Sequence, residues 1–224
     1  MQLAIVVPVL DEAAGITAFL QALAPLRARG AELIVVDGGS LDGTPALAAA
    51  DADQVISAPR GRARQMNAGA AATQAGVLLF LHADTRLPPH ADALLLEGLA
   101  QGRAAWGRFD VRIEGRSRLL PWVAGLMNHR SRLSGIATGD QAIFMCRRVF
   151  DAVGGFPDQP LMEDVEISRR LKRLSRPLCL RHAVTTSGRR WDQRGAWRTI
   201  VLMWRLRWQY WRGVAPERLA GLYR

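Results

Sequence analysis

Two acidic sites far apart in the sequence have the residue types and settings that catalysis needs. Glu163 and Asp164 open a pattern of polar and apolar residues that continues to Leu171, which predicts the first turn of a helix. Carboxylates are favoured there by the helix dipole, and one of them can project into a cleft as a general base. Stabilisation of the helix alone is the alternative role. Asp84 follows an apolar run, 77–81, so we expect it at the C-terminal end of a buried strand, where open α/β sheets bind ligands.

His82 lies two residues before Asp84, close enough to share its site. If the strand continues to Asp84, its period of two turns both side chains to one face, which would begin a site for a divalent metal. A packed residue at the strand end is an equally good interpretation of His82. His182, which follows the apolar run 178–180, has the same two interpretations, and the structural one is the more common for a lone histidine.

The elements that must position these residues follow two patterns. In the first half of the chain, strand-length apolar runs alternate with helix-compatible segments, which predicts right-handed βαβ units and a mostly parallel sheet covered on both faces. The runs are 3–9, 33–36, 54–58 and 77–81, and the segments between them are 15–29, 44–50 and 62–74. The second half is less regular, with strands expected at 107–113 and 141–146 and helices at 118–132, after 163, and at 193–212. The fold class is therefore α/β, followed by an α+β half on the same sheet.

The net charge of +10 at pH 7 is concentrated in the second half of the chain. Residues 1–100 hold ten acidic and six basic side chains, whereas residues 101–224 hold ten acidic and 24 basic ones. Anionic partners are therefore expected at the second half. That half carries no nucleic-acid-binding motif, which argues against a nucleic-acid partner. The composition, 49% hydrophobic and 22% charged, excludes a disordered chain.

Cysteine content and hydropathy predict the compartment. Cys146 and Cys179 are too few for a disulfide framework, so we expect both to be reduced. The first residues carry no basic leader, and no apolar stretch approaches the roughly 20 residues of a membrane span. We therefore expect a cytoplasmic protein that is soluble or peripheral to the inner face of the membrane.

Two loops after predicted strands carry groups that suit a phosphate-bearing ligand. The segment 36–44 combines Asp37 and Gly39 with free backbone N–H groups near the ligand edge of the sheet, although an ordinary turn explains it equally well. The segment 60–67 places three arginines, among them Arg60 and Arg64, at a helix start. They would attract a diphosphate there, unless they form a solvated basic face. Neither segment is a Gly-x-Gly-x-x-Gly fingerprint or a Walker loop.

Taken in chain order, these motifs resemble the family 2 glycosyltransferases of the GT-A fold. The resemblance covers about residues 3–175 and rests on segments 8–12, 36–44, 60–69, 81–85, 154–157 and 163–164. It implies a single GT-A domain with a Rossmann-like nucleotide-sugar-binding half at 1–100 and an acceptor-binding and catalytic half at 101–190, and a C-terminal amphipathic helix falls within 191–224. The residues that it implies for nucleotide binding are Pro8, Leu10, Asp11, Glu12, Asp37, Gly39, Arg60, Arg64, Asn67 and Ala83.

The resemblance also implies the chemistry of the two acidic sites. Asp84 would bind Mn²⁺ or Mg²⁺ on the diphosphate, Asp164 would be the base, and Glu163 would orient the acceptor or the base. Family members usually carry an Asp-x-Asp motif, and His82 replaces its first Asp here. Imidazole suits Mn²⁺ better than Mg²⁺, so His82 remains a candidate ligand. This variant, with the small size of the chain, resembles a branch associated with arsenosugar-type biosynthesis.

Three residues are candidates on the acceptor side. Asp140 precedes a predicted strand, in a loop that lies near the acceptor in relatives, although a turn role is an equally good interpretation. Arg190 and Trp191 are similar to the Arg-Trp element that closes over the active site in relatives.

The segment 193–212 predicts an amphipathic helix rich in tryptophan and arginine. Trp204, Trp208 and Trp211 fall on one side of it, with Arg198 and Arg205 along the border. Such a face suits a peripheral membrane contact or a homodimer interface, and burial within the fold is the third alternative.

The sequence therefore predicts a metal-dependent inverting glycosyltransferase of the hexosyltransferase class. Its expected donor is a nucleotide-sugar, with a UDP-sugar favoured, and its expected acceptor is a lipid phosphate or a small metabolite. One rival is a nucleotide- or polyanion-binding module without catalysis, which would rely on the basic second half. Another is a sugar nucleotidyltransferase, which would carry an N-terminal Gly-rich signature with Arg and Lys that residues 8–15 do not show.

Overall fold

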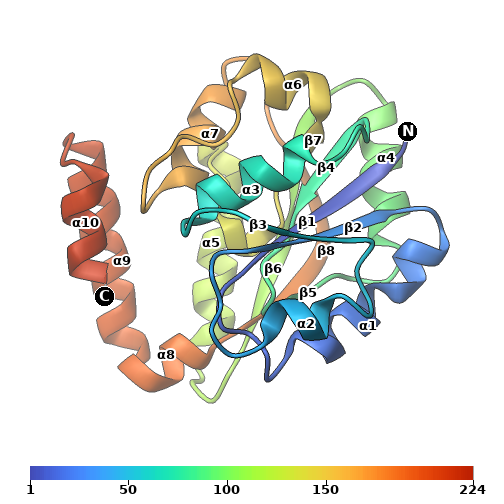
Figure 1. Ribbon diagram of the computed structural model, residues 1–224. Coiled ribbons are helices and arrows are strands. Elements are labelled where there is room, and N and C mark those ends of the chain that lie inside the picture. The colour runs from blue at the N-terminus through green and yellow to red at the C-terminus, as the bar shows by residue number, and fades with distance from the viewer. Residues whose placement is uncertain (224) are drawn as a thin grey trace.

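The central element of the protein is an eight-stranded sheet in the order β3-β2-β1-β4-β7-β6-β8-β5 (Figure 1). The computed structural model describes residues 1–223. The strands are β1 (Leu3–Val9), β2 (Glu32–Asp37), β3 (Gln54–Ser57), β4 (Val77–Phe80), β5 (Thr85–Arg86), β6 (Trp106–Glu114), β7 (Phe144–Cys146) and β8 (Leu178–Ser187). The helices are α1 (Ile16–Ala28), α2 (Thr44–Ala48), α3 (Arg62–Ala71), α4 (Ala91–Ala100), α5 (Leu120–Ser134), α6 (Arg147–Ala152), α7 (Glu163–Leu171), α8 (Arg189–Arg194), α9 (Ala196–Trp211) and α10 (Pro216–Tyr223), with a 3-10 helix, η1, at Gly139–Gln141.

Strands β1 to β4 form the parallel half of the sheet, as the alternation of apolar runs predicts. β1 lies between β2 and β4, and β3 extends the sheet beyond β2, with all pairings parallel. Alternate residues of β1 point to opposite faces, so Ile5 joins the core cluster that includes α1, whereas Val6 joins the one that includes α3. Gly69 lets α3 approach closely, because a Cβ there would lie 2.3 Å from Val6 Cγ1.

The second half of the chain extends the same sheet with mixed strand directions. β7 runs antiparallel to β4 and to β6, and β8 runs parallel to β6. The chain then returns to the ligand edge, because β5, which begins directly after Asp84, pairs with residues 185–186 of β8. β8 therefore brings the residues that follow it beside Asp84.

Two predicted elements differ in the structure. The strand expected at 141–146 is limited to β7, because residues 139–141 form η1. The helix expected at 193–212 is divided into α8 and α9 at Gly195, whose φ of +84° is in the left-handed region that glycine favours. The sequence patterns do not predict β5, α4, α6 or α10, and β8 extends well past the run 178–180, so that His182 lies exposed within it.

The C-terminal helices α9 and α10 form a hairpin at the side of the sheet (Figure 1). Leu206 of α9 and Leu219 of α10 pack with Leu161 and Met162, which precede α7. The opposite side of α9 stays open, with four tryptophans between 57% and 81% exposed. Within residues 1–223, the helices are all too short or too polar to cross a lipid bilayer.

Candidate active site

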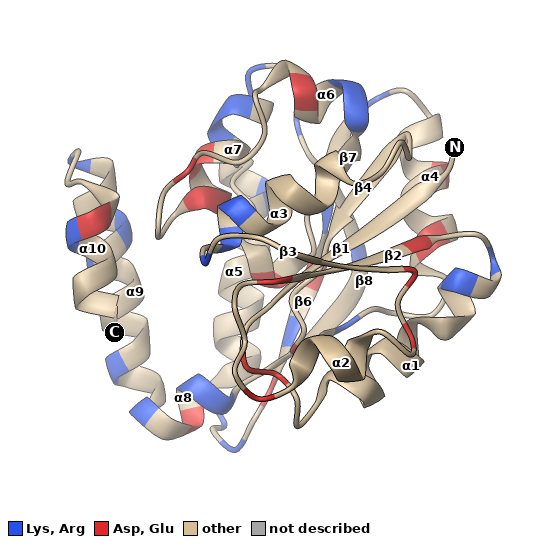
Figure 2. Cartoon of the chain, in the orientation of Figure 1, with Lys and Arg blue, Asp and Glu red and all other residues tan. Residues whose placement is uncertain are grey.

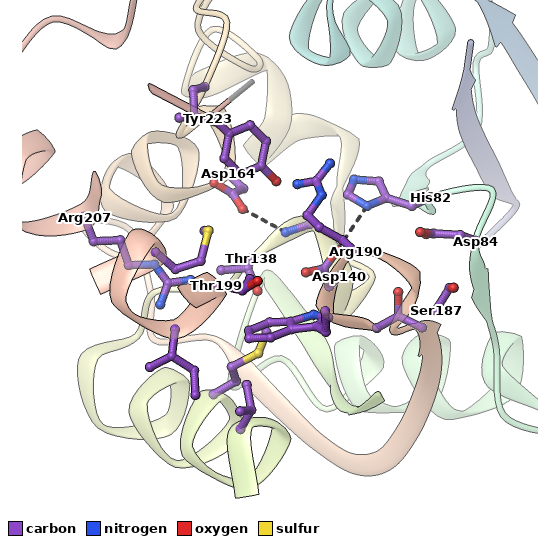
Figure 3. A pocket seen from close by; sticks show the side chains of 18 of the residues that line it. His82, Asp84, Thr138, Asp140, Asp164, Ser187, Arg190, Thr199, Arg207 and Tyr223 are labelled. Carbon is purple, nitrogen blue, oxygen red and sulfur yellow. Dashed lines mark hydrogen bonds and ion pairs between the residues drawn. The ribbon is translucent and has the colours of Figure 1, made fainter. Parts of the chain in front are cut away.

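A cavity of about 750 Å³ joins the two acidic sites, although they lie far apart in the chain (Figure 3). It is lined by loops after β1 and β4 and by parts of η1, α5, α7, α8 and α9. In the view of Figure 3, Asp84 lies on one side, Arg207 on the other, and Asp164 and Arg190 between them. The predicted residues that line it are Glu12, His82, Asp84, Asp140, Glu163, Asp164, Arg190 and Trp191.

Asp84 is presented by a turn and not by the strand itself. β4 ends at Phe80, so Asp84 follows the strand's C-terminal end, and the condition that would place His82 and Asp84 on one strand face is not met. The reason is a tight turn, in which the Thr85 N–H donates to the His82 carbonyl oxygen over 3.0 Å. The Ser187 N–H of β8 then donates to the Asp84 carbonyl oxygen over 3.1 Å, and the Asp84 side chain remains exposed at the cavity.

His82 packs against η1. Its Nδ1 lies 3.4 Å from Asp140 Oδ1, and a Cβ at Gly139 would lie 2.4 Å from its Cε1. Desolvation works to raise the pKa of Asp140, but the hydrogen bond from His82 and the charges of Arg62 and Arg190 outweigh it, so the pKa is lowered. The contact with Asp140 therefore holds His82 on the wall of the cavity.

The same turn holds Asp164. The Gly139 N–H donates to Asp164 Oδ2 over 2.9 Å, and the Val165 N–H donates to Oδ1 over 2.7 Å (Figure 3). Burial raises the pKa of Asp164 in spite of these bonds. Burial, and next the charge of Asp164, raise the pKa of Glu163, which is only 7% exposed, to about 6. Carboxylates with raised pKa values are suited to proton transfer near neutral pH.

Arg190 and Trp191 reach the cavity because β8 ends beside Asp84. Gly188 is required at this turn, since its N–H donates to the Glu114 carbonyl oxygen and a Cβ would lie 2.6 Å from that oxygen. Trp191 packs partly against the core. Burial, and next the charge of Arg62, lower the pKa of Arg190, and the guanidinium therefore lies where an anion would stabilise it.

Five arginines outside the predicted set also line the cavity: Arg62, Arg130, Arg189, Arg194 and Arg207. Arg189 Nη2 lies 3.8 Å from Glu12 Oε2, which connects α8 to the loop after β1. The spacing within 60–64 could have distinguished Arg62 from Arg64. Two side chains that are two residues apart on a helix point about 200° away from each other. Only one side of that run can therefore face the cavity.

Arg60, Arg64 and Asn67 lie outside the lining of the cavity. Arg64 pairs with exposed Asp158 over 2.7 Å, and Arg60 is itself exposed. Asn67 holds the backbone of Phe156 through hydrogen bonds of 2.8 and 2.9 Å, which is a structural role. Arg62 thus lines the cavity, where the sequence predicted Arg60 and Arg64.

The loops after β1 and β2 contact each other, and of their residues only Glu12 lines the cavity, so Asp11, Asp37 and Gly39 lie outside the lining. The Leu41 N–H donates to Asp11 Oδ1, and the Gly39 N–H donates to Asp37 Oδ2, each over 2.9 Å. Figure 2 shows acidic residues on these loops near α2, and basic residues along α8, α9 and α10. The other predicted nucleotide-binding residues are Pro8 in β1, Leu10 after it, and Ala83, which packs partly against the core.

The carboxylate at Asp84 suits a metal ion that is also bound by a substrate phosphate. In the described part of the chain, no cluster of three or more His, Cys, Asp or Glu side chains is arranged to bind a metal unaided. Asp84 nevertheless offers an exposed carboxylate. Burial raises the pKa of nearby Glu12, the charge of Arg189 lowers it, and the charge of Asp84 raises it further. Mg²⁺ commonly uses one or two carboxylates together with substrate phosphates, so this arrangement is sufficient for such an ion.

The sheet and its flanking helices have the GT-A fold. The chain belongs to glycosyl transferase family 2, because residues 4–153 match the model of that family. The predicted fold class and the predicted glycosyltransferase family are thereby confirmed. Among curated proteins, none matches the sequence.

Several solved structures share the fold at low sequence identity. S. aureus TarS 1-349 in complex with UDP-GlcNAc is 14% identical, with a TM-score of 0.66 over 84% of this chain and 58% of that one. The Pyrobaculum calidifontis mannosyltransferase PcManGT in complex with GDP-Man and Mn²⁺ is 19% identical, with a TM-score of 0.68 over 99% of this chain and 68% of that one. Glucosyl-3-phosphoglycerate synthase from Mycobacterium tuberculosis, with Mn²⁺, UDP and phosphoglyceric acid, is 21% identical, with a TM-score of 0.59 over 83% of this chain and 69% of that one. The chain spans 61% of the length of S. aureus TarS 1-349.

The raised pKa of Glu163 predicts how stability depends on pH. Because the folded-state pKa, about 6, exceeds the ordinary value of 4.5, the folded state binds the extra proton and the free energy of unfolding falls as pH rises between these values. Glu163→Gln removes this loss. The variant should therefore melt at a higher temperature than the wild type at about pH 8 and at nearly the same temperature at about pH 4. Thermal unfolding followed by circular dichroism measures both, and an equal difference at the two pH values would contradict the assignment.

Proposed function

We propose that the chain is a metal-dependent inverting glycosyltransferase that transfers a sugar from a nucleotide-sugar, preferably a UDP-sugar, to a lipid phosphate or a small-molecule acceptor. The observation that carries the proposal is the single cavity into which Asp84 and Asp164 both open. One carboxylate lies at the ligand edge of the parallel sheet, and the other is a half-buried group whose pKa is raised by burial. These are the surroundings that a metal ligand and a general base require.

The chain's own residues supply the charge and proton chemistry of the transfer. The acceptor oxygen bonds to the anomeric carbon while the bond from that carbon to the diphosphate breaks, and the diphosphate leaves with the bonding electron pair. Asp164 takes the proton of the attacking oxygen, which is an alcohol O–H in a small metabolite or a P–OH in a lipid phosphate, and Glu163 orients the acceptor or the base. Arg62 and Arg190 stabilise the leaving diphosphate, each by on the order of 4 kcal/mol at about 4 Å and an effective dielectric near 20. A Mn²⁺ or Mg²⁺ ion on Asp84 would neutralise further diphosphate charge. Attack opposite the leaving group inverts the anomeric centre.

The identity of the donor is proposed from the motifs and supported by the solved neighbours. The TarS structure is a complex with UDP-GlcNAc, the synthase structure is one with UDP, and the mannosyltransferase structure is one with GDP-Man. Two of these three nucleotides carry uracil, which supports a UDP-sugar. Membership of the arsenosugar-type branch is proposed on the variant at residues 81–85 and the small size of the chain.

The exposed side of α9 is proposed to rest on an anionic membrane surface at the inner face of the membrane. Trp204, Trp208 and Trp211 are each more than half exposed, and Arg198 and Arg205 beside them are exposed as well. Tryptophan suits the boundary between lipid headgroups and hydrocarbon, and arginine complements anionic lipids. This arrangement would bring a lipid acceptor to the cavity, because Trp204 also lines it.

Asp164→Asn should lower the transfer rate by ~10²- to 10⁴-fold, because it removes the base. UDP binding should stay close to that of the wild type, since the change leaves the diphosphate side of the cavity intact. Transfer by the full chain and calorimetric titration of UDP with Mn²⁺ measure the two quantities. Asp151→Asn, at an exposed position on α6, is the control. Equal losses of transfer and of UDP binding would remove Asp164 from this role.

Asp84→Ala should weaken UDP binding in the presence of Mn²⁺ by about tenfold or more, which is about 1.4 kcal/mol. It should have little effect when the metal is chelated, because the carboxylate acts through the ion. Thermal shifts with UDP and GDP, with and without Mn²⁺, measure this and compare the two bases. A wild type whose UDP binding is unaffected by Mn²⁺ would contradict the proposed metal site, and Asp151→Ala serves as the control.

The membrane proposal predicts that the full chain co-sediments with vesicles rich in phosphatidylserine and less with phosphatidylcholine vesicles. Each arginine near an anionic surface contributes about 1 kcal/mol, so Arg198→Gln with Arg205→Gln should weaken binding by at least tenfold. Trp208→Ala should weaken it as well. If the chain binds neither kind of vesicle but forms a dimer, and Trp208→Ala disrupts that dimer, this face is a homodimer contact instead.

A further inference from the structure

Arg130 is a charged group in the cavity that the proposed reaction does not use. It lies on α5, and its Nε and Nη2 atoms are buried with no hydrogen-bond partner among residues 1–223. Burial lowers its pKa, the charge of Asp164 raises it, and the charge of Arg108 lowers it again. A buried polar group without a partner lowers stability unless something else binds it.

The charges beneath α5 explain why Arg130 has no protein partner for these atoms. Arg108 is fully buried and donates to Ser131 Oγ over 3.0 Å and to the Asn128 carbonyl oxygen over 3.1 Å. It also pairs with Asp110, the carboxylate that Arg132 contacts over 2.5 Å. The Asp110 carboxylate is thus shared by two other arginines, and Arg130 lines the cavity, where the charge of Asp164 acts on it.

A second arginine is placed similarly on the facing helix. Arg207 of α9 lines the cavity, and its Nε is buried and makes no hydrogen bond within the described chain. Arg198 and Arg205 of the same helix are exposed, so Arg207 is distinct in being directed inward. Figure 3 shows Arg207 on the opposite side of Asp164 from Asp84. Arg62 and Arg190 lie with Asp140 and are therefore a separate group.

The walls around this part of the cavity are apolar. Val123 and Met127 of α5 line it together with Leu161 and Met203, and the exposed side chains of Leu126 and Trp204 form part of the lining too. A ligand here would meet hydrocarbon on most sides and guanidinium groups at the end beside Asp164.

We propose that Arg130 and Arg207 form a binding site for the anionic group of the acceptor, a phosphate or a carboxylate. The proposal rests on the proposed function, because it specifies the acceptor. A guanidinium binds either anion through two parallel hydrogen bonds, which would satisfy the buried N–H groups. An acceptor held in this way would lie next to Asp164, and the diphosphate would occupy the other side of the cavity.

The test uses the full chain saturated with UDP and Mn²⁺, so that the diphosphate side is filled. Phenyl phosphate and benzoate are then titrated by calorimetry. Arg130→Gln and Arg207→Gln should each weaken binding of the better probe by at least tenfold, and Arg130→Lys should recover part of it. Arg218→Gln, which removes an exposed charge from α10 outside the cavity lining, should bind like the wild type. Unchanged binding in both cavity variants, or no binding of either probe by the wild type, would overturn the proposal.

A second measurement does not depend on UDP. Without ligand, Arg130→Gln should melt about 3 °C higher than the wild type, because it removes a buried charge without a hydrogen-bonded partner. Phenyl phosphate should raise the melting temperature of the wild type and leave that of the variant unchanged. A variant that melts lower, and is stabilised by phenyl phosphate as much as the wild type, would show a packing role and overturn the proposal. If Arg130→Gln does not fold, the melting temperature of Arg207→Gln is measured with and without phenyl phosphate instead.

These outcomes separate the two proposals. A wild type that binds phenyl phosphate through Arg130 but binds neither UDP nor GDP would retain the anion site and refute the proposed function. A prenyl phosphate in phosphatidylcholine vesicles distinguishes the sources of the anion. Stronger Arg130-dependent binding of that lipid than of phenyl phosphate would identify a lipid acceptor, and the reverse would identify a water-soluble one.

Discussion

The geometry of the site depends on one short turn, η1, which fixes the two acidic sites relative to each other. Its Gly139 N–H binds Asp164, and its Asp140 contacts His82 at the end of β4. Because Gly139 has no room for a side chain against His82, the turn and the strand end meet in direct contact. The separation between Asp84 and Asp164 is therefore set by the backbone of η1 and by the packed His82 ring. Catalysis requires that the reacting groups be held in this way at a fixed separation.

The rest of the fold places the charged side chains around the cavity. The parallel half of the sheet places Asp84 at its ligand edge, and β8 returns the chain so that Arg190 follows beside it. Helices α5 and α9 then close the cavity with Arg130 and Arg207. Charges with few partners reduce stability, so their concentration in one cavity is better explained by ligand binding than by folding.

The sequence predicted the parallel half well because β1 to β4 are continuous apolar runs separated by helix-length segments. It also placed Glu163 and Asp164 in the first turn of a helix, where the structure has them. It failed where tertiary contacts decide local structure. The turn at residues 82–85 depends on pairing with β8, and the break at Gly195 interrupts a pattern that is otherwise continuous. The inward position of Arg130 could not be predicted, because it depends on how Arg108, Asp110 and Arg132 satisfy one another.

The most direct measurement is a crystal structure of the full chain with UDP and Mn²⁺. We expect electron density for the ion on the Asp84 carboxylate, with the diphosphate between the ion and Arg62 or Arg190, and Asp164 facing the β-phosphate across the cavity. UDP bound away from this cavity, or an ion held by other residues with Asp84 turned to solvent, would contradict this expectation.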